Sequence, residues 1–165
     1  MKIVYIDAQN VHRRMQDRWR VVDWNKFYIY LKDHIRPDEI YFAVWYIQKY
    51  QDFYTELEWY GYTMLYKEVI TKPNWDIKGN VDIDIAIRLI LDMCEEWLKS
   101  AYIVTNDGDY NTLINLCKER YVLGWLITPD AVKASKMLTK IAWDIIDMQE
   151  IRQYIEKQKD LANEA

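Results

Sequence analysis

The chain has 165 residues, a formal net charge of −4 and an isoelectric point near 5.3. The length is sufficient for one domain with a real core, and eight Trp and fourteen Tyr in a half-apolar composition exclude a chain that is mostly disordered. The acidic balance excludes the uniformly basic surface of a nucleic-acid coat protein, so a polyanion would have to bind local basic patches.

The cysteines and the apolar runs indicate the compartment. Cys94 and Cys117 are far apart and form no CxxC motif, so we interpret them as buried, reduced thiols of a cytosolic protein. No signal peptide precedes the first strand, and no apolar run reaches ~18 residues without a charge. We therefore expect a soluble, cytoplasmic protein that has no membrane partner.

The N-terminal stretch predicts a buried strand at residues 2–6, because it is short, apolar and β-branched. The strand runs into Asp7-Ala8-Gln9-Asn10. Residues 10–20 are polar and basic, with four arginines against Asp17: Arg13, Arg14, Arg18 and Arg20. This run is either a solvated loop or an arm that binds phosphates beside Asp7.

Alternating helices and strands are predicted up to residue 66. Asp23 is a plausible N-cap for a helix with apolar residues at helical spacing. A strand at 40–47 follows, then a short amphipathic helix from Tyr50 that ends at Gly61, and then a strand at 62–66.

The next two segments are a loop and a long helix. Residues 67–79 contain Pro73 and Gly79 and are predicted to form a loop. From Asn80 or Asp82 the apolar pattern continues to Leu98, which is too long for a strand. Its residues at helical spacing are Ile83, Ile87, Ile90, Cys94 and Trp97.

The C-terminal part predicts a strand at 101–105, a helix at 109–119 and a strand at 121–127. A basic turn, a short segment at 141–146 and a charged helix follow. Strands that alternate with helices imply right-handed crossovers and a mostly parallel sheet covered on both faces. We expect an α/β domain at 1–147 and a charged helical tail at 148–165.

Several carboxylates are expected at one edge of this sheet. Asp7 ends the first strand, Asp107 and Asp109 follow the strand at 101–105, and Asp82 opens the helix before it. Unpaired carboxylates that lie close together repel one another unless a proton or a cation intervenes. Mg²⁺ or Mn²⁺ suits such oxygen ligands and keeps water for a phosphate substrate, and Asn10 could hold that water or a phosphate oxygen.

Three stretches resemble the motifs of the NYN domain family, which belongs to the PIN-like metal-dependent nucleases. They are Ile3-Val4-Tyr5-Ile6-Asp7-Ala8-Gln9-Asn10, Lys78-Gly79-Asn80-Val81-Asp82 and Ile103-Val104-Thr105-Asn106-Asp107-Gly108-Asp109-Tyr110-Asn111-Thr112-Leu113. Their order and spacing match, and residues 135–147 resemble the closing segment of the family. Three motifs in order are far more specific than one.

The resemblance implies a PIN-like α/β/α sandwich with a five- or six-stranded sheet, a Mg²⁺ or Mn²⁺ site, and cleavage of RNA phosphodiester bonds. Carried over by position, the site would comprise Asp7, Asn10, Asp82, Asp107 and Asp109. Two positions depart from the family pattern. Ala8 replaces a frequent Gly, and Arg88 stands where the family often has another acid.

Each of these residues also has a purely structural interpretation. Asp7 and Asp107 could cap helices, and Asp109 could stabilise a helix dipole. Lys78 and the basic turn of Lys133, Lys136 and Lys140 could be solvated, although they could also bind phosphates. The ordered motifs favour the functional interpretation for the aspartates.

We therefore expect a metal-dependent endoribonuclease that acts on RNA, with single strands favoured. Asp7, Asp82, Asp107 and Asp109 would hold the metal, and the arginine run with Lys78 would bind the RNA backbone. The alternatives are a regulatory or scaffold module of the same fold that does not cut, and, less favoured, a small-molecule phosphatase. PIN-like proteins are often dimers, so a homodimer is one expected assembly.

Overall fold

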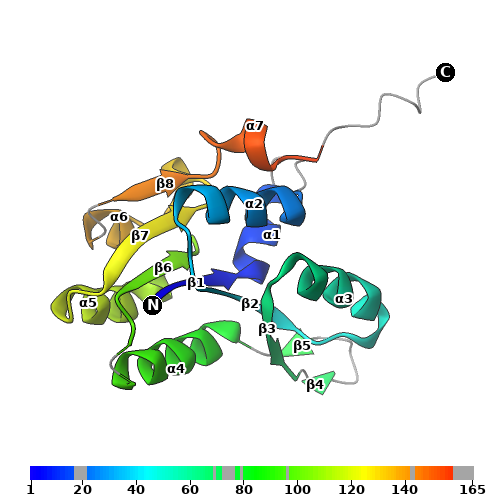
Figure 1. The fold of residues 1–165 in the computed structure, drawn as a ribbon, viewed down its shortest axis with the longest axis horizontal. Coiled ribbons are helices and arrows are strands. Elements are labelled where there is room, and N and C mark those ends of the chain that lie inside the picture. The colour runs from blue at the N-terminus through cyan, green and yellow to red at the C-terminus, as the bar shows by residue number, and fades with distance from the viewer. Residues whose placement is uncertain are drawn as a thin grey trace.

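Six parallel strands form the central sheet, in the order β3-β2-β1-β6-β7-β8 (Figure 1). The computed structural model describes residues 1–16, 22–68, 70–71, 77–78, 80–95, 97–141 and 144–157. The strands are β1 (Lys2–Asp7), β2 (Glu39–Trp45), β3 (Thr63–Lys67), β6 (Ser100–Val104), β7 (Leu123–Thr128) and β8 (Ile145–Asp147). Every pairing in this sheet is parallel, which confirms the predicted α/β fold.

Helices cover both faces of the sheet (Figure 1). On one face lie α1 (Ala8–Gln16), α2 (Trp24–His34), α3 (Gln51–Tyr60) and α7 (Arg152–Ile155). On the other lie α4 (Val81–Cys94), α5 (Asn111–Glu119) and α6 (Lys136–Ile141). The short helices are η1 (Gln48–Tyr50), η2 (Gly108–Tyr110) and η3 (Ala131–Lys133).

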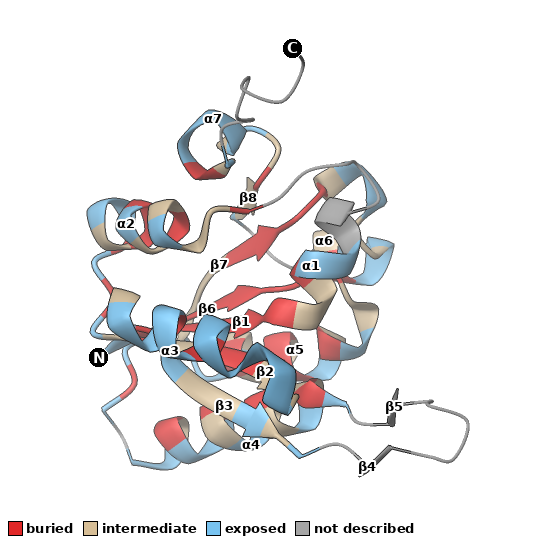
Figure 2. Cartoon of the chain, turned by 90° about the vertical axis from the view of Figure 1, so that its right-hand side faces the viewer, coloured by how far each residue is buried: buried red, intermediate tan, exposed pale blue. Residues whose placement is uncertain are grey.

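The alternation along β1 separates the core into two layers. Val4 and Ile6 belong to the cluster under α1, α2 and α3, whereas Ile3 and Tyr5 belong to the cluster over α4 and α5. Successive side chains of a strand point to opposite faces, so a fully buried strand has no polar side of its own. Figure 2 accordingly shows the central strands as almost continuously buried.

The order of the strands creates one special position, between β1 and β6. The chain first builds outward from β1 through β2 to β3, and then returns to place β6 on the other side of β1. The carboxyl ends of β1 and β6 therefore lie side by side at a topological switch point, where open α/β sheets bind their ligands. Asp7 is the last residue of β1.

One open alternative and one local expectation were wrong. The solvated-loop interpretation of the arginine run does not hold for its first part, because α1 starts directly after Asp7 and continues to Gln16, whereas the phosphate-binding interpretation stays a prediction. The predicted loop at 67–79 contains a small antiparallel hairpin of β4 (Ile70–Thr71) and β5 (Ile77–Lys78). The apolar residues of α1, Ala8, Val11 and Met15, do recur at helical spacing, so this helix could have been predicted. The strands of the hairpin have two residues each and are too short to show a period.

Helix α4 was predicted correctly, but its periodic apolar residues face outward. Ile83 and Ile87 are 58% and 53% exposed, whereas Val81, Ile85 and Leu89 are buried. The helix has apolar residues on both sides, so the period alone does not say which side packs on the sheet. It ends at Cys94, which is exposed rather than buried as predicted, while Cys117 is buried.

The end of the described chain packs against the N-terminal half. The backbone N–H of Asp23 donates to the carbonyl of Ile155 at 2.8 Å, and Met148 and Ile155 are buried. Of the predicted tail at 148–165, residues 158–165 lie outside the described residues. In the part of the chain that the structure describes, no helix combines the length and apolar character needed to cross a membrane.

Candidate active site

Asp7 is a buried carboxylate that also caps a helix. Its Oδ1 accepts the backbone N–H of Asn10 at 3.0 Å, and its Oδ2 accepts the Tyr110 hydroxyl at 3.2 Å. The residue is 6% exposed. Burial raises the pKa of Asp7 to about 6, against the effect of these two hydrogen bonds, and the charges of Asp82 and Asp107 raise it further. Asp7 therefore has the predicted capping role at the start of α1, and its functional role stays a prediction.

Asp107 lies just beyond β6, at the same edge of the sheet. Its backbone N–H donates to the Thr105 hydroxyl at 3.2 Å, and its Oδ1 accepts the backbone N–H of Asp109 at 3.1 Å. These two bonds form the tight turn that leads into η2. Asp109 itself is exposed at the start of η2, where its charge acts on Asp82.

Asp82 brings a third carboxylate to this edge from the first turn of α4. The Asn80 side chain donates to its Oδ2 at 2.6 Å, while its Oδ1 is buried and has no hydrogen-bond partner. Burial raises the pKa of Asp82, and the charges of Asp107 and Asp109 add to that effect. A buried carboxylate oxygen without a donor is costly, and a cation would satisfy it.

Asp84 provides the contrast within the same helical turn. Its carboxylate forms an ion pair with Lys67, whose Nζ lies 3.0 Å from Oδ2. Residues two apart on a helix point roughly 200° apart, so only one of Asp82 and Asp84 can face the other acids at this edge, which are Asp7, Asp107 and Asp109. We call these acids together with Asp82 the acid cluster. The charges of Asp107 and Asp109 act on Asp82, the aspartate that lies in the stretch resembling the family motif.

Two asparagines tie the ends of the strands together. The Asn10 Oδ1 accepts the backbone N–H of Asn106 at 2.7 Å. Asn106 is buried, its Oδ1 accepts the Thr128 hydroxyl at 2.8 Å, and its amide nitrogen donates to the Lys133 carbonyl at 3.4 Å. Because the oxygen of Asn10 is already used, its amide nitrogen is the group left to contact a phosphate oxygen.

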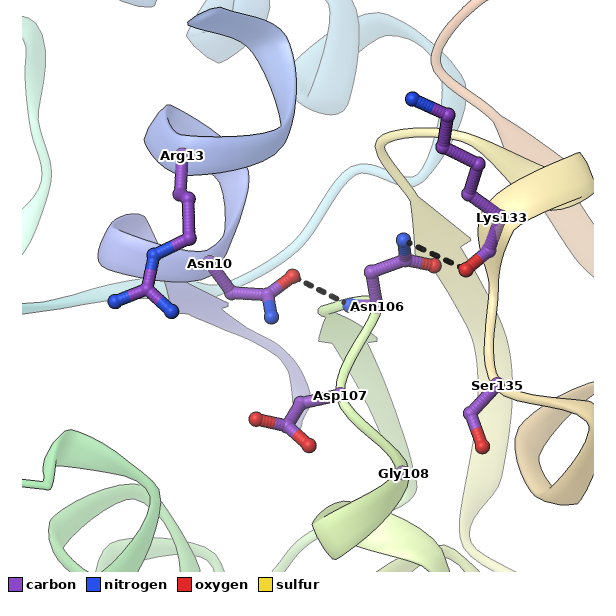
Figure 3. A pocket seen from close by; sticks show the side chains of 7 residues that line it. All are labelled: Asn10, Arg13, Asn106, Asp107, Gly108, Lys133 and Ser135. Atoms are coloured by element: carbon purple, nitrogen blue, oxygen red, sulfur yellow. Dashed lines mark hydrogen bonds between the residues drawn. The ribbon is translucent and has the colours of Figure 1, made fainter. Parts of the chain in front are cut away.

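A cavity of about 210 Å³ opens beside Asp107 (Figure 3). Its walls come from α1, from the turn after β6 and from the segment after β7. The lining residues are Asn10, Arg13, Asn106, Asp107, Gly108, Lys133 and Ser135. The cavity thus combines one carboxylate of the cluster with two cations and several neutral polar groups.

The remaining predicted basic residues are only partly described. Arg13 is exposed and lines the cavity. Arg14 lies in α1 and Lys78 in β5, and only their backbones are described. Arg18 and Arg20 lie outside the described residues. The predicted RNA-binding role of this set stays a prediction.

Arg88, the departure from the family pattern, makes its ion pair away from the cluster. Its Nε donates to Asp92 Oδ2 at 3.1 Å and its Nη2 pairs with Oδ1, while the Tyr5 hydroxyl donates to Oδ2 at 2.8 Å. The guanidinium also lies over the Tyr41 ring. The charge of Arg88 is therefore used to neutralise a buried carboxylate under the sheet.

The cluster fits a hard divalent cation by its chemistry, although its ligands are not gathered tightly. Among the described residues, no three Asp, Glu, His or Cys side chains are arranged closely enough to hold a metal ion. Mg²⁺ commonly binds through one or two carboxylates and keeps several waters, so a tight triad is not required. The partnerless Asp82 oxygen and the raised pKa of Asp7 both indicate negative charge that no ion pair among the described residues offsets.

Three residues of this region were not assigned to the site from the sequence: Asn106, Tyr110 and Ser135. Lys133 was left open between a solvated and a phosphate-binding residue. Asn106 and Tyr110 lie inside the motif that contains Asp107, so their position was a usable signal. Lys133 and Ser135 reach the site through the pairing of β7 with β6. No local sequence pattern predicts that these two residues lie close to Asp107.

Comparisons with known proteins agree with this architecture. The sequence model of the NYN domain matches residues 2–149. A search of curated proteins finds no match. Among solved structures, a Vibrio parahaemolyticus protein of unknown function, VPA0982, superposes with a TM-score of 0.77 at 18% identity, covering 93% of this chain and 94% of that one. At this identity the likeness shows the fold alone.

Proposed function

The chain belongs to the NYN domain family, which has a PIN-like nuclease fold, and from this premise we propose that it is a metal-dependent ribonuclease that hydrolyses RNA phosphodiester bonds. The observation that supports the proposal most is that three acids from separate segments, Asp7, Asp82 and Asp107, lie close enough for their charges to act on one another. Asp7 and Asp107 follow the adjacent strands β1 and β6 at the switch point of the sheet, where this fold class binds ligands.

Asp7, Asp82 and Asp107 would hold Mg²⁺ or Mn²⁺, directly or through water, with Asp109 at the exposed side of the cluster. When bound, such an ion activates water and offsets the charge on the phosphoryl group. The hard carboxylate oxygens match either ion. The bond from the Tyr110 hydroxyl keeps the Asp7 carboxylate in a fixed orientation.

The other residues would position the substrate. The exposed Asp109 carboxylate would accept a hydrogen bond from the attacking water and so orient it. The Asn10 amide nitrogen and the Arg13 guanidinium would donate to phosphate oxygens, which fix position without reading sequence. We expect single-stranded RNA to be cut with little sequence preference.

Two neighbouring aspartates allow a matched test. Pure protein is incubated with single-stranded RNA in Mn²⁺ or Mg²⁺, with EDTA as a control, and the products are separated on a gel. Asp82→Asn and Asp107→Asn should lower the cleavage rate by about 100-fold or more. Asp84→Asn removes the same charge from the same turn but faces Lys67, so its rate should stay near wild type. Equal rates for Asp82→Asn and Asp84→Asn would reject the site.

A module of the same fold that binds RNA or a protein partner without cutting is the second candidate. It is favoured by the loose arrangement of the acids, since no three metal-ligating side chains of the described residues are gathered closely. Metal binding and RNA binding without cleavage in any tested cation would favour this candidate. The expected homodimer stays a prediction, which sedimentation of the pure protein would check.

A further inference from the structure

The cavity beside Asp107 has two sides of different chemistry. Asp107 and the acid cluster form one wall, whereas the other walls carry hydrogen-bond donors and cations from α1 and from the segment after β7 (Figure 3). This second set reaches the cavity from segments that are more than 100 residues apart in the chain. The β1–β6–β7 part of the sheet holds them together.

The neutral lining groups are arranged to donate hydrogen bonds. The Asn10 Oδ1 is occupied by the Asn106 backbone N–H, and Figure 3 shows the Asn10 amide nitrogen turned toward the Asp107 side. Ser135 Oγ accepts the backbone N–H of Met137 at 3.3 Å. Its hydroxyl hydrogen therefore remains for an acceptor in the cavity.

Gly108 allows the Ser135 hydroxyl to approach this closely. A Cβ at position 108 would lie 2.7 Å from Ser135 Oγ and 3.2 Å from Ser135 Cβ, which is closer than side-chain atoms pack. A side chain at position 108 would require the Ser135 hydroxyl to turn away and the Ser135 Cβ to shift by a few tenths of an ångström. The glycine thus leaves room for the Ser135 hydroxyl beside the turn that carries Asp107.

Two cations flank the cavity. Arg13 and Lys133 are both exposed, and the carboxylates of the described residues form no ion pair with either. In Figure 3 the Arg13 guanidinium lies on the Asn10 side, and the Lys133 ammonium extends along the rim away from Asp107. The long stem of a lysine lets such a group turn toward a bound anion.

We propose that this cavity is a phosphate subsite, which binds the RNA phosphate next to the one that is cut. The inference rests on the proposed function, because it takes RNA as the substrate. Arg13 and Lys133 together with Asp107 leave the lining with one net positive charge, which matches the single charge of a phosphodiester. A terminal phosphate monoester carries about −1.5 to −2 at neutral pH and is matched less well.

The binding test does not depend on cleavage. A fluorescent oligouridine is titrated in EDTA, and anisotropy is followed over a range of salt concentrations. Lys133→Ala and Arg13→Ala should each weaken binding by about tenfold, and each should reduce the salt slope by about one. Lys133→Arg keeps the positive charge that Lys133→Ala removes, so it should bind as wild type does. Lys136→Ala removes an exposed lysine three residues further on that does not line the cavity, and it should have little effect.

The outcomes separate the subsite from the nuclease activity. Equal losses for Lys133→Ala and Lys136→Ala, or an unchanged salt slope for Lys133→Ala, would overturn the subsite even if the protein cuts RNA. A loss specific to Lys133→Ala and Arg13→Ala would support it even if wild type cuts nothing. A second arm compares 5′-phosphorylated with 5′-hydroxyl oligouridine. Equal binding of the two supports an internal phosphate, and a preference for the 5′-phosphate that Lys133→Ala abolishes would overturn that assignment.

Discussion

Asp92 and Asp7 are both buried carboxylates, yet the fold treats them in opposite ways. Asp92 lies under the sheet at 2% exposure, where Arg88 and the Tyr5 hydroxyl donate to it. Asp7 lies at the switch point at 6% exposure, where it accepts from one backbone N–H and the Tyr110 hydroxyl. The first carboxylate has a cation of the protein beside it, whereas the neighbours of the second are further acids.

The difference shows in the proton affinity of Asp7. Its pKa rises to about 6 because burial disfavours the charged form and the charges of Asp82 and Asp107 add to that effect. The chain can neutralise a buried carboxylate, as Arg88 does for Asp92. Within the described part of the chain, Asp7 has no such cation beside it, which is costly for stability and is the arrangement expected where a metal cation is to bind.

The largest expected change in stability comes from removing Arg88, the cation that is paired with Asp92. Arg88→Met would leave Asp92 buried and unpaired, and we expect the free energy of unfolding to fall by about 3 kcal/mol. Urea denaturation followed by circular dichroism measures it. Adding Asp92→Leu to Arg88→Met removes the stranded charge and should recover most of the loss. An Arg88→Met protein as stable as wild type would show that the pair does not neutralise Asp92.

Removing the charge of Asp7 is expected to stabilise the folded protein rather than destabilise it. Asparagine keeps the cap of α1 but carries no charge, so Asp7→Asn should raise the free energy of unfolding by roughly 2 kcal/mol at pH 8 in EDTA. The folded-state pKa lies above the ordinary value, so the proton on Asp7 stabilises the fold at low pH. That stability is full below about pH 4 and is lost as the pH rises through about 6.

The gain from Asp7→Asn should therefore be largely gone at pH 4, where Asp7 is protonated in the folded state and about half protonated in the unfolded state. Thermal melts at pH 4 and pH 8 compare the two proteins. An equal gain in stability at both pH values would mean that packing rather than charge is responsible. A loss of stability at pH 8 would contradict the inference that the charged form of Asp7 destabilises the fold.

A cation should narrow the difference in stability between these two proteins. At a free Mn²⁺ concentration of roughly ten times its Kd, wild type should gain about 1.4 kcal/mol, since the ion binds the folded state alone. Asp7→Asn should gain much less. The gain of wild type should also shrink as the pH falls through about 6, because protons then compete for Asp7. Thermal melts with and without Mn²⁺ measure both effects, and a shift that is independent of Asp7 and of pH would place the ion elsewhere.

The fold was largely predictable because its signals are local. The apolar run at 2–6 and the alternation of strands with helices gave the parallel sheet, and Gly61 was correctly predicted to end α3. The sequence did not predict which side of α4 packs on the sheet. Ile83 and Val81 are equally apolar, and only the neighbouring strands decide that Val81 packs inward.

The site was predictable to the extent that it lies in motifs next to strand ends. Asp7 and Asp107 follow β1 and β6, and adjacent parallel strands bring their carboxyl ends together. The Asn106 and Ser135 contributions depend on how β7 sits beside β6 and how η3 folds back, which are properties of the assembled sheet. The spacing of Arg88 and Asp92, four residues apart on a predicted helix, allowed their pairing, but the burial of Asp92 under the sheet was not visible in the sequence.

The smallest expected effect concerns the ion pair that shares a helical turn with the cluster. Lys67 and Asp84 are each about one-third exposed, so water screens their attraction, and Asp84→Asn should lower the free energy of unfolding by only about 0.5 kcal/mol. Because Asp84 already has a cation of the protein beside it, the variant should keep the full Mn²⁺-dependent gain of wild type. Asp82→Asn, two residues earlier, should lose most of that gain. If Asp84→Asn instead abolished the Mn²⁺ response, the ion would belong to the Lys67 side of α4, and Asp82 would be a structural residue only.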